Sequence, residues 1–334
     1  MTRPVSKEEP RARIARLKVH GGGPNGSAVS DDAVLAWLLE PAEPAMRYLA
    51  SRDLVRPRPG ERTLARLRAE VPNQGWAAKV LARQKAKTYW ATKRECYGPK
   101  FRATIWQLQV LADFGMTRRD ERIANAVDLW FDLHYNPKGG GYSPGPRGDR
   151  WFRNHLCTTG NMVRSLIRFG YLDDERVQSA IRWLVDEQYP SGGWDCFGRP
   201  DATMDAWEAM SAFAEIPKGR RTSDVKRAIA NGAEFFLEHR LLHEGARFAQ
   251  WWWLRYPWHY FYDVLVGLDF MTALGYGEDP RMKEALDHLE SKRLPDGRWN
   301  LDWTNGNLVV ESRGKPSKMI TFLALRALQR AGRG

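Results

Sequence analysis

Four aspartates near predicted helix starts are the residues of this sequence best suited to acid chemistry. Asp195, Asp201 and Asp205 follow a Gly-Trp loop, and Asp263 comes directly before an apolar segment. A carboxyl group that is buried at such a position has a raised pKa and can donate a proton to a substrate. Each of these aspartates can instead cap a helix or form a polar pair that faces solvent. Both interpretations stay open at this point.

A run of aromatic residues leads up to Asp263, with eight aromatic side chains between positions 251 and 262. The members that we nominate for substrate binding are Trp251, Trp252, Trp258, Tyr260 and Tyr262. A cluster of this density before a predicted inner helix is expected to reach a central cavity. There, aromatic faces can line an apolar pocket and stabilise a carbocation. The alternative is that the same side chains pack between helices in the core.

Helices must position these groups, because apolar residues recur at three- and four-residue spacing along most of the chain. The predicted helices cover 102–115, 119–134, 156–169, 173–188, 201–214, 222–241, 260–274, 278–293 and 317–331. Gly115, Gly170 and Gly275 each end one of them, since a left-handed C-cap favours glycine. Acids follow each glycine, and we interpret them as caps of the next helix rather than as a metal cluster.

A repeat organises these helices. Gly170 is followed 24 residues later by Trp194, and Gly275 is followed 24 residues later by Trp299. Each unit is an inner helix, a glycine turn, an outer helix and a Gly/aromatic loop. About five or six such hairpins predict an all-α fold, an α/α toroid around a central cavity, with an open solenoid as the competing geometry.

One domain is expected after a basic arm. Residues 1–28 are rich in Arg, Lys, Gly and Pro, and we predict a flexible arm there. The toroid then covers 29–334, with degenerate repeats to about 100 and clearer repeats over 101–331.

The clearest repeat resembles a known motif. Trp183, Leu184, Gln188, Gly192 and Trp194 match the aromatic-Leu-x3-Gln-x3-Gly-x-Trp (QW) repeat of the squalene cyclase and protein prenyltransferase superfamily. The resemblance implies a terpenoid cyclase-like α/α toroid that binds or transforms an isoprenoid. It also implies a structural role for the motif itself, in which glutamine and tryptophan hydrogen-bond to neighbouring helices.

The sequence lacks some of the catalytic motifs that the resemblance implies. Class II terpene cyclases protonate an alkene with an Asp-x-Asp-Asp motif, which this sequence lacks. The proton donors would then come from the four aspartates above. Protein prenyltransferases use zinc, but the cysteines here have no recognised zinc spacing, so we expect no cofactor. A metal site formed by Cys96, Cys157 and Cys196 is the alternative.

Two other classes of function remain. Polysaccharide lyases also use α/α rings, and the loop 150–155 contains Arg153 and His155. There, the arginine can neutralise a uronate carboxylate while the histidine abstracts the adjacent proton. The remaining alternative is a toroid without catalysis that binds a lipid or a protein.

Composition limits the partners. The net charge of +12 is spread along the chain and interleaved with acids, which is typical of solvated helix faces. No nucleic-acid-binding signature accompanies it, so we expect an apolar small molecule, with an anionic membrane surface as a second partner. Three cysteines, no apolar signal segment and no membrane-spanning run favour a cytoplasmic protein, with peripheral membrane contact as an option.

Overall fold

The computed structural model describes residues 31–243, 249–305 and 310–333. Within these ranges the regular elements are helices, and extended backbone occurs only as isolated bridges. The arm predicted for 1–28 lies outside the described residues. No helix in the described part of the chain combines the length and the apolar character needed to cross a membrane.

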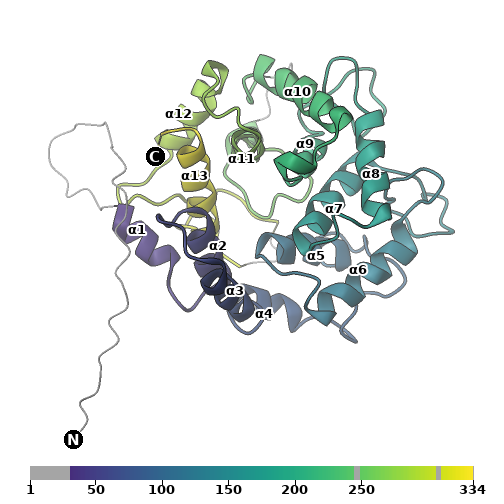
Figure 1. Cartoon of the computed structure of the whole chain (residues 1–334), viewed down its shortest axis with the longest axis horizontal. Coiled ribbons are helices and arrows are strands. Elements are labelled where there is room, and N and C mark those ends of the chain that lie inside the picture. Colours follow the sequence, from purple (N-terminus) through teal and green to yellow (C-terminus); the bar gives the residue numbers. More distant parts are fainter. Residues whose placement is uncertain (1–30, 244–248, 306–309, 334) are drawn as a thin grey trace, which may run out of the picture.

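Six helices form the inner wall of a ring (Figure 1). They are α2 (Pro44–Asp53), α5 (Thr104–Asp113), α7 (Leu156–Phe169), α9 (Glu208–Ala214), α11 (Val264–Leu274) and α13 (Lys318–Arg330). From α5 onward each inner helix packs against the next, and α13 contacts α2, which closes the ring. The predicted all-α toroid is therefore confirmed.

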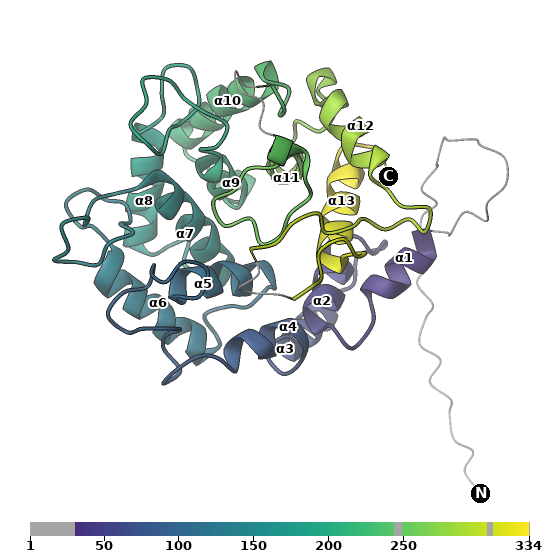
Figure 2. The same ribbon diagram turned by 180° about the vertical axis from the view of Figure 1, so that it is seen from behind.

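A second layer of helices surrounds this wall, as the view from behind also shows (Figure 2). It consists of α1 (Asp31–Leu38), α3 (Glu61–Glu70), α4 (Gly75–Leu81), α6 (Glu121–His134), α8 (Glu175–Asp186), α10 (Ser223–Glu238) and α12 (Lys283–Ser291). Three short 3-10 helices, at Lys218–Arg220, Ala249–Trp252 and Pro280–Met282, belong to the connections. Each inner helix from α5 to α11 contacts the outer helix that follows it, so the repeat of the sequence corresponds to one hairpin of the ring.

The turns inside the hairpins follow the predicted capping chemistry. Gly170 and Gly275 both have left-handed backbone, with φ of 97° and 101°, and end α7 and α11. The side chains of Asp120, Asp174 and Asp279 each accept a hydrogen bond from the backbone N–H two residues later. These acids are caps, as predicted.

The tryptophans of the repeat join the outer helices to the loops that follow them. The indole N–H of Trp194 donates to the carbonyl of Leu184 at 2.8 Å, and that of Trp299 donates to the carbonyl of Leu289 at 2.7 Å. The side chain of Gln188 donates to a backbone carbonyl of α10 at 2.8 Å. All three groups therefore have structural partners.

Charged side chains hold the two ends of the ring together. Arg326 of α13 donates to Asp53 of α2 at 3.1 Å, across 273 positions of sequence. Lys318, also on α13, donates to Glu40 at 2.7 Å and to the carbonyl of Trp37 at 2.6 Å. The joint thus combines helix packing with ion pairs.

Candidate functional site

A cavity of about 240 Å³ lies where α7 and α9 begin, and we call it the rim cavity. Its wall comes from these helix starts and from the loops before α9 and α11. The residues that line it are Cys157, Cys196, Phe197, Asp205, Glu208, Gln250, Trp251, Arg255, Tyr260, Phe261 and Tyr262. Aromatic rings, two carboxyl groups and two thiols therefore meet in one small space.

Two cysteines and one histidine form a cluster at this cavity. His155 is the N-cap residue of α7 and Cys157 is the second residue of that helix. The Nδ1 atom of His155 lies 3.2 Å from the Sγ atom of Cys157. Potential ligand atoms of His155, Cys157 and Cys196 all lie within 4.8 Å of one another. The fold therefore brings together Cys157 and Cys196, two of the three cysteines named in the alternative metal site, and adds His155 to them.

The three residues of the cluster shift one another's pKa values. The hydrogen bond from the Cys196 thiol, together with the His155 imidazole, lowers the pKa of Cys157. The same contact with Cys157 raises the pKa of Cys196, and the hydrogen bond to Cys157 raises the pKa of His155. The start of a helix also favours a thiolate. Cys157 is thus the thiol most ready to ionise.

Cys96, the third cysteine nominated with these two, lies elsewhere in the core. It is fully buried, and burial raises the pKa of its thiol to about 12. Its backbone N–H donates to Nε2 of His134 at 2.9 Å. His155 therefore replaces Cys96 in the cluster.

Glu208, the first residue of α9, is a site residue that the sequence analysis missed. It is 1% exposed, and neither carboxyl oxygen has a hydrogen-bond partner among the described residues. Burial raises its pKa well above the ordinary value, and the nearby Cys157 adds to the effect. An acid inside the apolar stretch Ala206–Met210 was the signal that could have identified it.

The nominated aspartates before α9 occupy different environments. The helix predicted over 201–214 begins only at Glu208, because the backbone N–H of Thr203 is bound to the carbonyl of Trp194 at 2.8 Å. Asp205 lines the rim cavity, and burial raises its pKa. Asp201 is exposed and does not line this cavity. Asp195 accepts hydrogen bonds from two backbone N–H groups of its own loop.

Asp263 caps α11. Its carboxylate accepts from the backbone N–H groups of Val266 at 2.9 Å and Arg255 at 3.1 Å. Complete burial raises its pKa to about 7, partly opposed by the Arg255 guanidinium. Asp263 is not among the residues that line the rim cavity, so its position fits the capping interpretation.

The aromatic run divides among three places. Trp251, Tyr260 and Tyr262 line the rim cavity. Trp258 lines a separate cavity at the centre of the ring. Trp252 lies edge-on to His288 on α12, with ring centroids 4.7 Å apart. The run therefore supplies both a pocket wall and core packing.

The cavity at the centre of the ring, which we call the central cavity, has a volume of about 350 Å³ and differs from the expected aromatic pocket. Nine charged side chains line it, alongside four aromatic ones. The aromatic wall expected at the centre is instead concentrated at the rim cavity. Four of the eight rings in the run, those of Trp251, Tyr260, Phe261 and Tyr262, line the rim cavity, whereas those of Tyr256 and Trp258 line the central cavity.

Arg153, nominated for substrate binding, lies in the loop before α7. Its guanidinium packs over the ring of Trp151 at 5.6 Å, and its backbone N–H donates to the hydroxyl of Ser143 at 3.1 Å. It does not line the rim cavity. The imidazole of His155 contacts the thiol of Cys157, whereas Arg153 contacts Trp151 and Ser143.

No protein-family model matches the chain. The chain is similar to a protein from Actinoplanes, with 16% identity and a TM-score of 0.45 over 87% of this chain and 90% of that one. It is also similar to the type II terpene cyclase MstE from Scytonema in complex with geranylgeranyl dihydroxybenzoate. That match has 13% identity and a TM-score of 0.48, over 91% of this chain and 96% of that one.

A polysaccharide lyase matches with 14% identity and a TM-score of 0.29, over 85% of this chain and 72% of that one. Identities of this size assign no site residue of the present chain.

Proposed function

We propose that this protein is a zinc-dependent enzyme that transforms a small apolar substrate of the isoprenoid type in the rim cavity. The observation that carries the proposal is the cluster of His155, Cys157 and Cys196, whose ligand atoms lie within 4.8 Å of one another. Two thiols and one imidazole are a donor set that zinc prefers. Tetrahedral zinc holds such atoms about 3.5 to 4 Å apart, so small side-chain movements suffice.

The arrangement of three ligands also fits a catalytic zinc site better than a structural zinc site. Zinc held by three protein ligands keeps a fourth position for a substrate or water, which it polarises as a Lewis acid. Cys157 and Cys196 both line the rim cavity, so that position would face the substrate space. Glu208 lines the same space and can hold or move a proton there.

The wall of the rim cavity supports an apolar substrate. Trp251, Tyr260 and Phe261 present aromatic surface, and Phe197 stands at the mouth with 72% of its surface exposed. Aromatic faces bind the carbon chain of an isoprenoid and stabilise positive charge that develops on it. Asp205 and Arg255 supply polar contacts for a functional group at one end of the substrate.

Metal analysis of the purified protein tests the first part of the proposal. We expect about one zinc per chain, reduced to background in Cys157→Ala and Cys196→Ala. Cys96→Ala is the matched control and should retain zinc, because Cys96 is a buried cysteine outside the cluster. Wild type that holds no zinc after reconstitution, or a stable disulfide between Cys157 and Cys196, would overturn the metal assignment.

Assays with geranyl and farnesyl alcohols and diphosphates test the second part. We expect product formation by the zinc-loaded wild type and at least a hundredfold loss in Glu208→Gln. Asp201→Asn should remain active, because Asp201 is exposed and does not line the rim cavity. Mass spectrometry of the native protein after lipid extraction gives an independent reading of what the cavity holds.

A second candidate is acid-initiated cyclisation of the isoprenoid without metal. It is favoured by one observation: the two carboxyl groups of Asp205 and Glu208 lie beside aromatic faces, and burial raises the pKa of both. This candidate requires activity that survives chelation and is lost in Glu208→Gln. Release of ultraviolet-absorbing uronate, lost in His155→Ala, would instead establish the lyase alternative. A ligand that co-purifies with every inactive variant would indicate a binding protein.

A further inference from the structure

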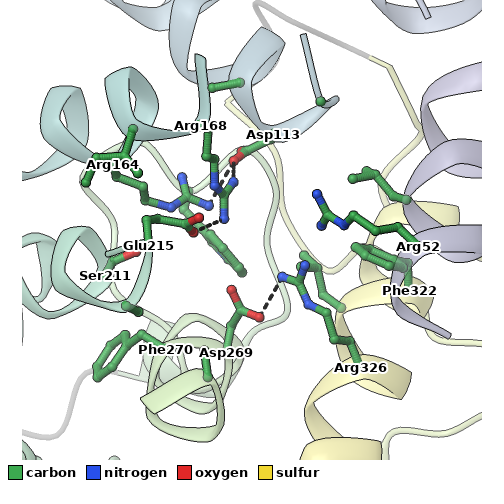
Figure 3. Close-up of a pocket in the computed structure, with 18 of the residues that line it drawn as sticks. Arg52, Asp113, Arg164, Arg168, Ser211, Glu215, Asp269, Phe270, Phe322 and Arg326 are labelled. Carbon is green, nitrogen blue, oxygen red and sulfur yellow. Dashed lines mark hydrogen bonds and ion pairs between the residues drawn. The ribbon is translucent and has the colours of Figure 1, made fainter. Parts of the chain in front are cut away.

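A second potential binding site lies at the other end of the inner helices. The central cavity takes most of its wall from the later turns of α5, α7, α9 and α11 and from α2 and α13. In Figure 3 the side chains of Arg52, Arg164, Arg168 and Arg326 converge on it from three sides. It shares no lining residue with the rim cavity, so its function can be tested separately.

Positive charge is in excess around the central cavity. Six arginines line it, namely Arg52, Arg68, Arg164, Arg168, Arg326 and Arg330, together with the three acids Asp113, Glu215 and Asp269. Asp53, which pairs with Arg52 and Arg326, adds a fourth acid. The arginines therefore exceed these acids by two around the cavity.

The acids are shared among arginines rather than matched one to one. Asp113 pairs with both Arg164, at 2.8 Å, and Arg168. Asp269 pairs with Arg326 at 2.6 Å and with Arg330 at 3.3 Å. Burial tends to raise the pKa of Asp269, but these guanidinium groups hold it below its ordinary value, so the carboxyl group is already ionised.

Two buried guanidinium groups keep unused donors. The Nε atoms of Arg164 and Arg326 have no hydrogen-bond partner in the described part of the chain, although the two residues are only 4% and 6% exposed. A buried donor without a partner is costly, especially on a charged group. A ligand oxygen in the cavity would remove that cost, and the planar guanidinium fork suits carboxylate and phosphate groups.

A wider cavity adjoins the central cavity. A neighbouring cavity of about 750 Å³ shares Arg52, Arg68 and Gly115 with the central cavity. Arg58, Arg118 and Arg119 also line it, with Glu61 and Asp120 as its acids. A cleft with this balance of charge raises the local concentration of anions and speeds their entry.

We propose that the central cavity binds a small multivalent oxyanion, a molecule of metabolite size that carries phosphate or carboxylate groups. The guanidinium groups of Arg52, Arg164 and Arg326 hold the charged groups. Phe270 and Phe322 line the same cavity and contact the carbon part of the ligand. The proposal does not depend on zinc or on the substrate of the rim cavity.

Calorimetric titration of the full chain with inorganic pyrophosphate and, separately, with citrate tests the proposal. We expect saturable binding of at least one of them with one site per chain, and which one binds distinguishes phosphate from carboxylate ligands. Raising the sodium chloride concentration from 50 to 500 mM should weaken the binding severalfold, because the attraction is screened. Failure of both anions to bind at millimolar concentration would overturn the proposal, whatever the rim cavity does.

Variants locate the binding. Arg52→Gln should weaken it about tenfold, since one charged hydrogen bond is lost. Asp113→Asn should strengthen it, because the excess of positive charge grows, whereas a merely loosened fold would weaken it. Arg281→Gln removes an arginine of the outer surface, which pairs with Glu234, and should change nothing. Equal weakening in Arg281→Gln and Arg52→Gln would show non-specific surface binding. Thermal unfolding of each variant confirms that it is folded.

Discussion

Gly160 of α7 lies so close to Glu208 of α9 that a Cβ atom at position 160 would be 2.6 Å from both the carbonyl carbon and the Cβ atom of Glu208. Backbone cannot yield as a flexible side chain does. We therefore expect Gly160→Ala to reduce the free energy of unfolding by about 1–3 kcal/mol, as overpacking does. Because the clash is with Glu208 itself, the variant should also lose activity in the rim cavity. Urea denaturation and the isoprenoid assay measure the two effects.

Gly219→Ala is the matched control for this substitution. Gly219 is exposed, and a Cβ atom there would meet nothing within 4 Å. The free energy of unfolding of Gly219→Ala should stay within about 0.5 kcal/mol of that of wild type. A stable and fully active Gly160→Ala protein would show that α7 and α9 are not in this close contact.

His134 makes stability depend on pH. Its Nδ1 lies 2.9 Å from the carbonyl of Ser143, to which it donates, and its Nε2 accepts from the backbone N–H of Cys96 at 2.9 Å. Burial lowers its pKa from 6.5 to about 4. The neutral imidazole therefore stabilises the fold fully above pH 6.5, and that contribution is lost as the pH falls toward 4.

We expect His134→Gln to be less stable than wild type at pH 7.5, because one hydrogen-bonded group is lost. The difference in free energy of unfolding should narrow by about 2 kcal/mol between pH 7 and pH 5, because the imidazole of unfolded wild type then takes up a proton that the buried imidazole, with its pKa of about 4, does not. Urea denaturation at the two pH values gives the comparison. A difference in free energy of unfolding between wild type and His134→Gln that stays constant from pH 7 to pH 5 would contradict the assigned role of the neutral imidazole.

Trp299 should be structural. Its ring is fully buried, and its N–H donates to the carbonyl of Leu289 at 2.7 Å. Trp299→Phe removes this hydrogen bond, so the Leu289 carbonyl keeps the longer one from the Lys292 N–H at 3.3 Å, and it creates a small cavity, at a cost of about 1–3 kcal/mol. Zinc content should not change. Trp151→Phe, at a tryptophan that is 52% exposed, is the control and should leave the melting temperature nearly unaltered. Loss of zinc without loss of stability in Trp299→Phe would contradict a structural role of Trp299.

Phe197 should contribute to binding more than to stability. It lines the rim cavity but is 72% exposed, so Phe197→Ser removes little buried surface in the free protein. We expect the affinity for geraniol to fall about fivefold, as loss of about 1 kcal/mol of apolar contact requires. Quenching of tryptophan fluorescence during titration measures the affinity. Unchanged affinity would place the ligand away from this mouth.

Local signals in the sequence were sufficient for the helical hairpins, whereas closure into a ring rather than an open solenoid depends on the contact between α13 and α2. Glycine turns, capping acids and helical periodicity depend on residues a few positions apart, so the helices around Gly170 and Gly275 and the cap at Asp174 could be predicted closely. The start of α9 was placed seven residues too early, because the hydrogen bond between Thr203 and Trp194 is not visible in periodicity.

The candidate site depends on contacts across hairpins, which spacing does not reveal. His155 and Cys157 are neighbours in sequence, but Cys196 joins them only because two successive units of the ring begin at the same rim. The apolar stretch around Glu208 could have identified this acid, but the close packing of α7 against it depends on Gly160, 48 positions away in the sequence. The arginines of the central cavity are scattered over four helices, α2, α3, α7 and α13, so no segment of sequence shows their convergence.

The ion pair between Arg326 and Asp53 joins two helices that the ribosome makes at very different times. A ribosome releases α2 long before α13, so the nascent ring stays open until α13 has been synthesised. During that time the carboxylate of Asp53 lacks its partner on α13, and the inner faces of α2 and α11 stay uncovered. Contacts between such distant segments form slowly because a long loop must close first. Newly made chains are therefore expected to need shielding from aggregation until α13 has joined the ring.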